Sequence, residues 1–196
     1  FALYVTFKEK SFKYMNHNYY CFSGDDIWSI ADYTYENWPK GYMFLTPASS
    51  KSEIWADCGI IMTYMKFEDV ERWSGTFVEK RGQEYLDFKA EKAEILLDRV
   101  EERFPGFRSS IKSYYTSSPL TYRDYTGTYR GSMYGIEKDS NDPLNSYVSF
   151  KTKIPNLLLT GQNINMHGVV GVTISSLLTC GAILGVNSLI KKVRDA

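Results

Sequence analysis

Two small-residue turns near the carboxyl end of the sequence could bind a ligand through their backbone. One turn at residues 161–163 follows a short apolar run, and another at residues 168–172 opens a stretch that predicts a helix. A helix N-terminus supplies unpaired N–H donors and a partial positive charge, so it favours a ligand with negative charge. The candidate binding residues are Gly161, Gln162, Asn163, Gly168, Val169, Val170, Gly171 and Val172. The residues alone favour a structural interpretation, in which the glycines only permit close packing of the helix.

Four further side chains are candidates to lie near a ligand. His167 directly precedes the predicted helix and either borders the ligand or caps and packs the turn. Arg123 and Tyr125 either shape a binding cleft or belong to a structural hydrogen-bond network. Tyr134 lies in the same tyrosine-rich stretch. No two residues are convincing as a general acid and base, so no catalytic residue is assigned.

The first 150 residues predict a β-sheet with a helix packed on it. Strands are expected at residues 1–9, 19–22, 42–46 and 59–65. Residues 83–104 predict a helix that ends at the following Pro-Gly pair. The expected apolar face of this helix contains Leu86, Ala90, Ala93, Leu97, Val100 and Phe104.

The second half of the sequence has a different pattern. Residues 113–153 show no clear period and are predicted to be irregular, either with a function or as a loop that wraps the core. Leu157–Thr160 predicts a buried parallel strand, and a helix is expected from about Gly171 to Lys192. Because residues 168–190 carry no formal charge, a membrane span is an alternative there. The Ser, Thr and Asn side chains in this stretch argue against it.

Composition excludes several classes of protein. Lys plus Arg equals Asp plus Glu at 23 each, so nucleic acid is not an expected partner. Three scattered cysteines and two histidines predict neither a disulfide framework nor a metal site, and they favour a reducing compartment such as the cytoplasm. The sequence begins without Met inside a strand pattern, from which we expect a fragment of a longer protein.

The sequence resembles the phytoene desaturase family of FAD-dependent oxidoreductases, including its carotenoid isomerase and retinol saturase branch. Residues 155–172, PNLLLTGQNINMHGVVGV, resemble the C-terminal flavin motif of that family. Residues 118–127, SPLTYRDYTG, and 131–135, GSMYG, resemble the segment that precedes this motif. HNYY at residues 17–20 and FPGF at residues 104–107 are shorter similarities to the same branch.

The resemblance implies an α+β (α/β) fold in two parts. Residues 1–150 would be mainly the substrate-binding domain, a mixed or antiparallel sheet with packed helices that forms a tunnel for a polyisoprenoid. Residues 151–196 would be the final strand, turn and helix of a truncated, Rossmann-like FAD-binding domain. The 14 glycines include no G-x-G, so the turn that binds the FAD pyrophosphate would lie in an absent N-terminal half. The family often has an acidic residue after Gly161, where this sequence has Gln162 and Asn163.

The expected function is hydride transfer or isomerisation at the C=C or C–C bonds of a carotenoid-like or retinoid-like substrate, with FAD in the complete enzyme. The chain alone is expected to be inactive and to bind FAD weakly or not at all. Expected partners are the hydrophobic isoprenoid-like molecule and the missing FAD domain, with a homo-oligomer and peripheral membrane contact left open. A lipid-binding or assembly module without FAD is the alternative. We also expect Gly171→Val to lower FAD affinity far more than folding stability.

Overall fold

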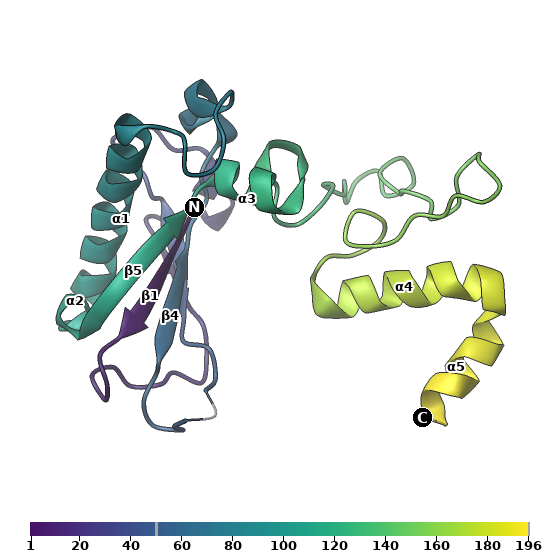
Figure 1. The fold of residues 1–196 in the computed structure, drawn as a ribbon, viewed down its shortest axis with the longest axis horizontal. Coiled ribbons are helices and arrows are strands. Elements are labelled where there is room, and N and C mark those ends of the chain that lie inside the picture. Colours follow the sequence, from purple (N-terminus) through teal and green to yellow (C-terminus); the bar gives the residue numbers. More distant parts are fainter. Residues whose placement is uncertain (50, 196) are drawn as a thin grey trace. The chain divides into compact units, whose positions relative to one another are not determined.

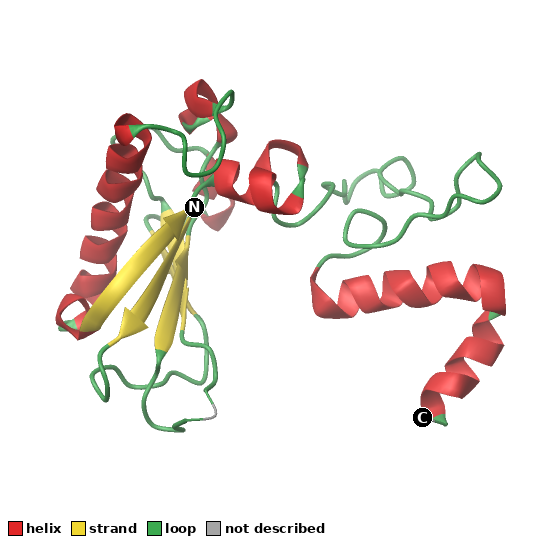
Figure 2. Ribbon diagram, in the orientation of Figure 1, coloured by secondary structure: helices red, strands yellow, loops and turns green. Residues whose placement is uncertain are grey.

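The computed structural model describes residues 1–49 and 51–195, which form two compact units, Phe1–Gly131 and Ser132–Ala196. Unit 1 contains a sheet with a long helix on one face, and unit 2 contains irregular segments followed by two helices (Figure 1, Figure 2). The α+β class expected from the sequence is confirmed. The assignment of a substrate role and a cofactor role to two parts of the chain stays a prediction.

The sheet of unit 1 is open, five-stranded and antiparallel, with the order β2-β3-β4-β1-β5. Its strands are β1 (Ala2–Phe7), β2 (Tyr19–Phe22), β3 (Gly41–Leu45), β4 (Cys58–Met62) and β5 (Ile111–Ser117). The four strands predicted in the first 75 residues are confirmed: β2 has the predicted bounds, and the ends of the other three are shifted by one to three residues. Alternation in β1 sends Leu3, Val5 and Phe7 into the core, because successive side chains of a strand point to opposite faces.

The helix α1 (Gln83–Arg103) confirms the helix predicted at residues 83–104. Ala93, Leu97 and Val100 are buried as expected, but Leu86 is 54% exposed and Ala90 is exposed too. Those two positions of the predicted face are therefore wrong. Tyr85 and Phe88 are buried instead, since they share a face with Lys92 and Leu96 at successive spacings of three, four and four residues.

The prediction of irregular structure from residue 113 onward is wrong for its first part. β5 is an edge strand that pairs with β1. Its sequence does not alternate between apolar and polar residues, because polar side chains and the exposed Tyr114 and Tyr115 lie on both faces, so it was not predicted as a strand. α3 (Pro119–Thr126) follows at once, started by a capping box between Ser118 and Thr121. Residues 132–153 contain no helix or strand, as predicted.

Shorter helices connect these elements. They are η1 (Ile27–Ala31), η2 (Phe67–Asp69), η3 (Glu71–Trp73), α2 (Phe107–Ser110) and η4 (Tyr129–Gly131).

Unit 2 differs from the expected strand, turn and single helix. Leu157–Thr160 is not a strand: Leu158 forms an isolated bridge with Lys151, and residues 132–195 contain no strand that could complete a ladder. Two helices, α4 (Gly168–Leu184) and α5 (Val186–Arg194), replace the predicted single helix. They are separated at Gly185, whose φ of +81° takes the backbone out of the helical region. None of the helices in the described ranges is long and apolar enough to cross a membrane.

Candidate functional site

A groove of about 1040 Å³ opens on unit 1 beside β5, the first turns of α1 and α3. Tyrosines dominate its lining, and they are Tyr4, Tyr85, Tyr115, Tyr122 and Tyr125. Neighbouring strands β1 and β5 bring the rings of Tyr4 and Tyr115 into a stack, with centroids 5.0 Å apart. The hydroxyls of Tyr4 and Tyr122 lie 3.3 Å apart. The groove therefore presents aromatic surfaces with hydroxyl groups at defined positions, which can contact an apolar ligand.

Lys89 is the lysine that lines this groove. Burial lowers the pKa of Lys89, and the nearby Arg81 guanidinium lowers it further. The ammonium also lies 5.6 Å from the centre of the Tyr85 ring. Lys89 consequently adds to the polar part of the lining, which also contains Glu79, Arg81 and Gln83.

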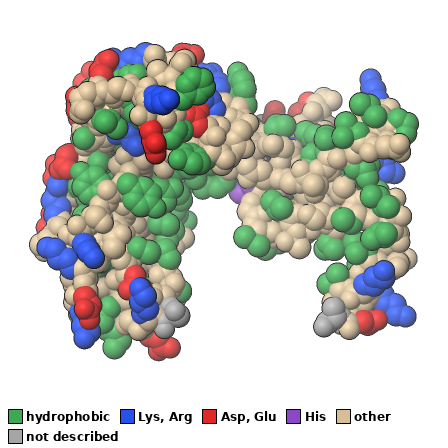
Figure 3. All heavy atoms as spheres, viewed as in Figure 1, with side chains coloured by type: hydrophobic (Ala, Val, Ile, Leu, Met, Phe, Trp, Pro, Cys, Tyr) green, Lys and Arg blue, Asp and Glu red, His purple; other side chains and the backbone are tan. Residues whose placement is uncertain are grey.

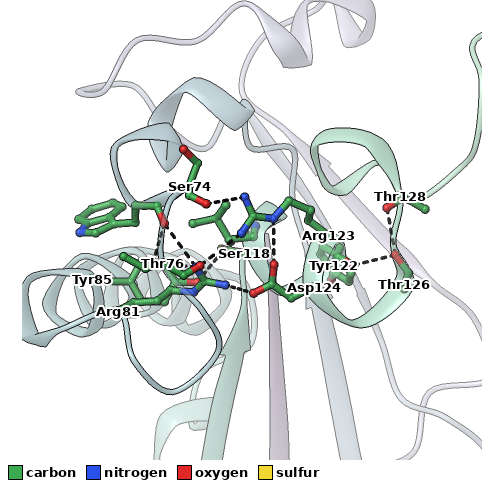
Figure 4. Close-up of polar contacts among 12 residues, drawn as sticks. Ser74, Thr76, Arg81, Tyr85, Ser118, Tyr122, Arg123, Asp124, Thr126 and Thr128 are labelled. Carbon is green, nitrogen blue, oxygen red and sulfur yellow. Dashed lines mark hydrogen bonds and ion pairs between the residues drawn. The ribbon is translucent and has the colours of Figure 1, made fainter.

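Arg123 takes part in a hydrogen-bond network next to the groove (Figure 4). Its guanidinium donates to the Ser74 carbonyl over 2.8 Å and to the Asp124 carboxylate over 2.8 Å. Asp124 also pairs with the buried Arg81, which donates to the carbonyl and the hydroxyl of Thr76 over 2.9 Å each. The network ties α3 to the loop before α1, so Arg123 fits its structural interpretation.

Tyr125 is placed differently from Arg123. It lines the groove and is 73% exposed, so its ring is accessible to a ligand.

Arg81 and Asp124 were missed by the sequence analysis. An Arg and an Asp separated by 43 residues leave no local signal, because only the tertiary fold brings them together.

Ser118 was also missed, although its position in the sequence carries a signal. Its side chain accepts a hydrogen bond from the Leu120 N–H over 3.1 Å, and it lies 2.7 Å from the Tyr85 hydroxyl. Ser-Pro-Leu-Thr is a helix start by composition, with an N-cap serine and a proline in the first turn. Ser118 thereby fixes the start of α3 against α1.

Unit 2 brings together two sequence segments that both contribute to the family resemblance. The rings of Tyr134 and His167 lie 5.0 Å apart. Gly135 lies so close to the second segment that an added Cβ atom would stand 2.8 Å from the Gln162 carbonyl oxygen and from the Asn163 side-chain oxygen. Gly135 adopts a φ of +81° there, which explains why a glycine occupies this position.

Gly171 is a packing residue in this structure. It is buried, and an added Cβ atom would stand 2.5 Å from the backbone carbonyl carbon and oxygen of Met166. Gly171→Val is therefore expected to lower folding stability as well, because a branched side chain would push the first turn of α4 away from residues 161–167.

The first turn of α4 faces outward. Val169 and Val170 are 86% and 71% exposed. Within the described residues, the N–H groups of Gly168, Val169 and Val170 donate no hydrogen bond, and the side chain of His167 does not cap them. Gly161, Gln162 and Val172 are half-buried, whereas Asn163 and Gly168 are exposed. The turn thus offers free donors and a partial positive charge to an incoming ligand.

Two buried polar side chains of unit 2 were not singled out by the sequence analysis. The Asn165 amide nitrogen and the Ser175 hydroxyl have no hydrogen-bond partner among the described residues. Thr179 instead finds a partner, since its hydroxyl donates to the Leu159 carbonyl over 2.8 Å and holds residues 157–160 against α4. Unpaired buried groups are rare in folded proteins, so Asn165 and Ser175 are exceptions in this unit.

Comparison of the sequence with known proteins identifies the family of this chain. Human all-trans-retinol 13,14-reductase is 31% identical over 151 residues, which cover 72% of this chain and 25% of the relative. The rat protein of the same name is 28% identical over 192 residues, 90% of this chain and 31% of the relative. The chain belongs to the retinol saturase and phytoene desaturase family. No family model matches it.

The retinol saturase relatives are much longer than this chain, which spans about a quarter of their length. A zebrafish relative named inactive all-trans-retinol 13,14-reductase is also similar, at 24% identity over 126 residues, 64% of this chain and 21% of the relative. Similarity to this chain is therefore shared by retinol saturase relatives named as reductases and by one named as inactive.

Proposed function

We propose that the complete protein is an FAD-dependent oxidoreductase that reduces a carbon–carbon double bond of a retinoid or a related polyisoprenoid. The observation that carries the proposal is the similarity over most of the chain to proteins named all-trans-retinol 13,14-reductase. Desaturation and cis–trans isomerisation of the same class of substrate would use the same arrangement of groups.

The first turn of α4 would contact the flavin end of FAD, which supplies the hydride when bound. Val169 and Val170 are exposed, so this turn is accessible, and the N–H groups of residues 168–170 are free to donate. The helix N-terminus favours the negative charge that builds up on a reduced flavin. Gly171 supports the turn by allowing its close approach to Met166.

The tyrosine-lined groove of unit 1 would form part of the substrate cleft. A polyene has few polar atoms, so its recognition depends on apolar area, shape and the exclusion of water. The groove offers aromatic faces from Tyr115 and Tyr125, and hydroxyls from Tyr4 and Tyr122 that can orient a terminal alcohol. Its volume of about 1040 Å³ is ample for a drug-sized apolar molecule.

A turnover assay tests the proposal. The complete protein is supplied with FAD, reduced chemically under anaerobic conditions and mixed with all-trans-retinol. The expected product contains one double bond fewer and two hydrogen atoms more. Mass spectrometry detects the added hydrogen atoms, and the absorbance maximum of the shorter polyene moves to a shorter wavelength. Protein that is folded and flavin-loaded, yet leaves retinol and related polyenes unchanged, would contradict the proposal.

A lipid-binding module without FAD is the second candidate function. The observation in its favour is that a relative named as inactive matches the chain as well. This candidate predicts that the complete protein binds retinol with no flavin absorbance after purification and none gained on incubation with FAD.

A further inference from the structure

The last helix of the chain has a strongly segregated surface. At 3.6 residues per turn, the apolar side chains of α5 fall within an arc of about 100°. They are Val186, Leu189, Ile190 and Val193. Lys192 and Arg194 flank this arc on its two sides, and Lys191 lies behind it. Such an arrangement is typical of a helix that lies in the plane of a membrane interface.

The apolar arc of α5 is largely open in the described part of unit 2, although Leu189 is half-buried and the Val186 side chain lies against Gly181 of α4. Val186 is 47% exposed, Ile190 is 42% exposed and Val193 is 61% exposed. At the end of the preceding helix, Ile183 is 71% exposed and Leu184 is 56% exposed. Figure 3 shows blue Lys and Arg side chains gathered at the end of α5 beside green apolar ones. Free apolar area of this size on one face marks an interaction surface.

The charged side chains of α5 are all cationic. Lys191, Lys192 and Arg194 are the formally charged residues of the sequence between Lys153 and Asp195. None of the three forms an ion pair in the described part of unit 2, and Asp195 after the helix leaves a net charge of +2 (three cations minus one anion). The whole chain has a formal net charge of zero, so this cationic surface is local.

We propose that α5 docks on an anionic lipid surface, with its apolar arc at the boundary of the acyl chains and its cations at the headgroups. The long stems of Lys192 and Arg194 can lie along the apolar layer while their charged ends reach phosphate and carboxylate groups. A protein partner would have to supply carboxylates on both sides of one apolar groove. An anionic leaflet has negatively charged groups along the whole boundary of its apolar layer, so it fits the arc and its flanking cations without a specific groove. The docking does not depend on flavin binding, and it places a protein with an apolar cleft at the membrane in which apolar substrates dissolve.

Sedimentation with lipid vesicles tests the docking in the complete protein. One set of vesicles contains phosphatidylcholine alone, and the other contains phosphatidylcholine and phosphatidylserine in equal amounts. Wild-type protein is expected to sediment with the anionic vesicles and to be released by salt. The combined variant Lys191→Gln, Lys192→Gln, Arg194→Gln is expected to bind about a hundredfold more weakly, since each cation near such a surface contributes about fivefold.

Two further variants make the test specific. Ile190→Asn removes apolar area from the arc and is expected to weaken binding to the anionic vesicles, with the thermal unfolding midpoint unchanged. Lys13→Gln, Lys80→Gln, Lys153→Gln is the control with the same change in net charge at three exposed positions, and it is expected to bind like the wild type. Docking is overturned if the wild type ignores anionic vesicles or if the control loses binding as the α5 variant does. If Ile190→Asn lowers the unfolding midpoint and the wild type does not bind vesicles, the apolar arc packs against another segment of the complete protein and the proposal is overturned.

Discussion

Gly171 shows how one residue decides between two interpretations of the same motif. The residues alone favour helix packing over the approach of a ring, and the structure agrees, because an added Cβ atom at Gly171 would stand 2.5 Å from the Met166 carbonyl. Exposed neighbours such as Val169 are instead accessible to a ligand. The sequence could predict the turn and its glycines, but not which atoms approach them, because that depends on how the chain before α4 folds back.

Gly171→Ala is expected to destabilise unit 2 and to lower flavin content together. Overpacking of a tight contact typically costs about 1–3 kcal/mol, and here the neighbouring atom is backbone and cannot rotate away. Thermal unfolding followed by circular dichroism measures the loss of stability. Gly75→Ala is the matched control, since nothing lies within 4 Å of a Cβ atom added there. Unchanged stability of Gly171→Ala would show that residues 161–167 pack differently.

Ser118→Ala is expected to destabilise unit 1 by about 2 kcal/mol. The substitution removes the cap of α3, typically worth about 1 kcal/mol, and leaves the buried Tyr85 hydroxyl without its partner at a similar cost. The double variant with Tyr85→Phe should recover part of the loss, because no unpaired hydroxyl remains. Urea unfolding of the single and double variants gives both values, and additive losses would show that the two hydroxyls do not interact.

At the scale of elements, patterns with strong apolar contrast were predictable and weak ones were not. β1 and α1 follow from alternation and from three- and four-residue spacing. β5 was missed because an edge strand with exposed tyrosines shows no such contrast. The predicted strand at Leu157–Thr160 failed for the opposite reason: its sequence suits a sheet, but a strand exists only where a neighbour pairs with it.

The FPGF motif at residues 104–107 proves to be a structural turn. Gly106 has a φ of +89°, and Phe107 is fully buried against Phe44. The Glu101 carboxylate accepts hydrogen bonds from the N–H groups of Gly106 and Arg108, each over 2.7 Å. These backbone donors, with Arg108 first, hold the pKa of Glu101 below its ordinary value.

A pH-dependent contribution to stability follows from this turn. Because the pKa of Glu101 is lowered in the folded state, its stabilising effect is present above the ordinary pKa of glutamate and is lost as the pH falls through the lowered value. Glu101→Ala should therefore lower the unfolding midpoint at neutral pH, with a difference from the wild type that shrinks in acid. Scanning calorimetry at several pH values follows this difference, and a gap that stays constant down to acid pH would refute the role of the carboxylate.

At the scale of the whole molecule, this chain supplies part of what the proposed activity needs. It spans about a quarter of the length of its relatives and contains no G-x-G turn for a pyrophosphate. The 196-residue chain alone should therefore bind FAD at least about a hundredfold more weakly than the complete protein, because the pyrophosphate contacts dominate dinucleotide binding. Calorimetric titration compares the two. Equal affinities would mean that residues 1–196 hold a complete cofactor site.

The central claim, that the first turn of α4 contacts the flavin, is tested most directly by Val169→Asp in the complete protein. Val169 is 86% exposed, so the change disturbs no packing, and an acidic residue in the first turn of a helix stabilises that helix. Leu144→Asp is the control, since Leu144 is 87% exposed in the same unit and lies outside the turn. An anaerobic titration with reduced FAD is carried out for all three proteins. We predict an unchanged or higher unfolding midpoint and at least about tenfold weaker binding of reduced FAD for Val169→Asp alone, from repulsion between the new carboxylate and the negative charge of the reduced flavin. Equal affinity of Val169→Asp, the control and the wild type for reduced FAD would contradict the account.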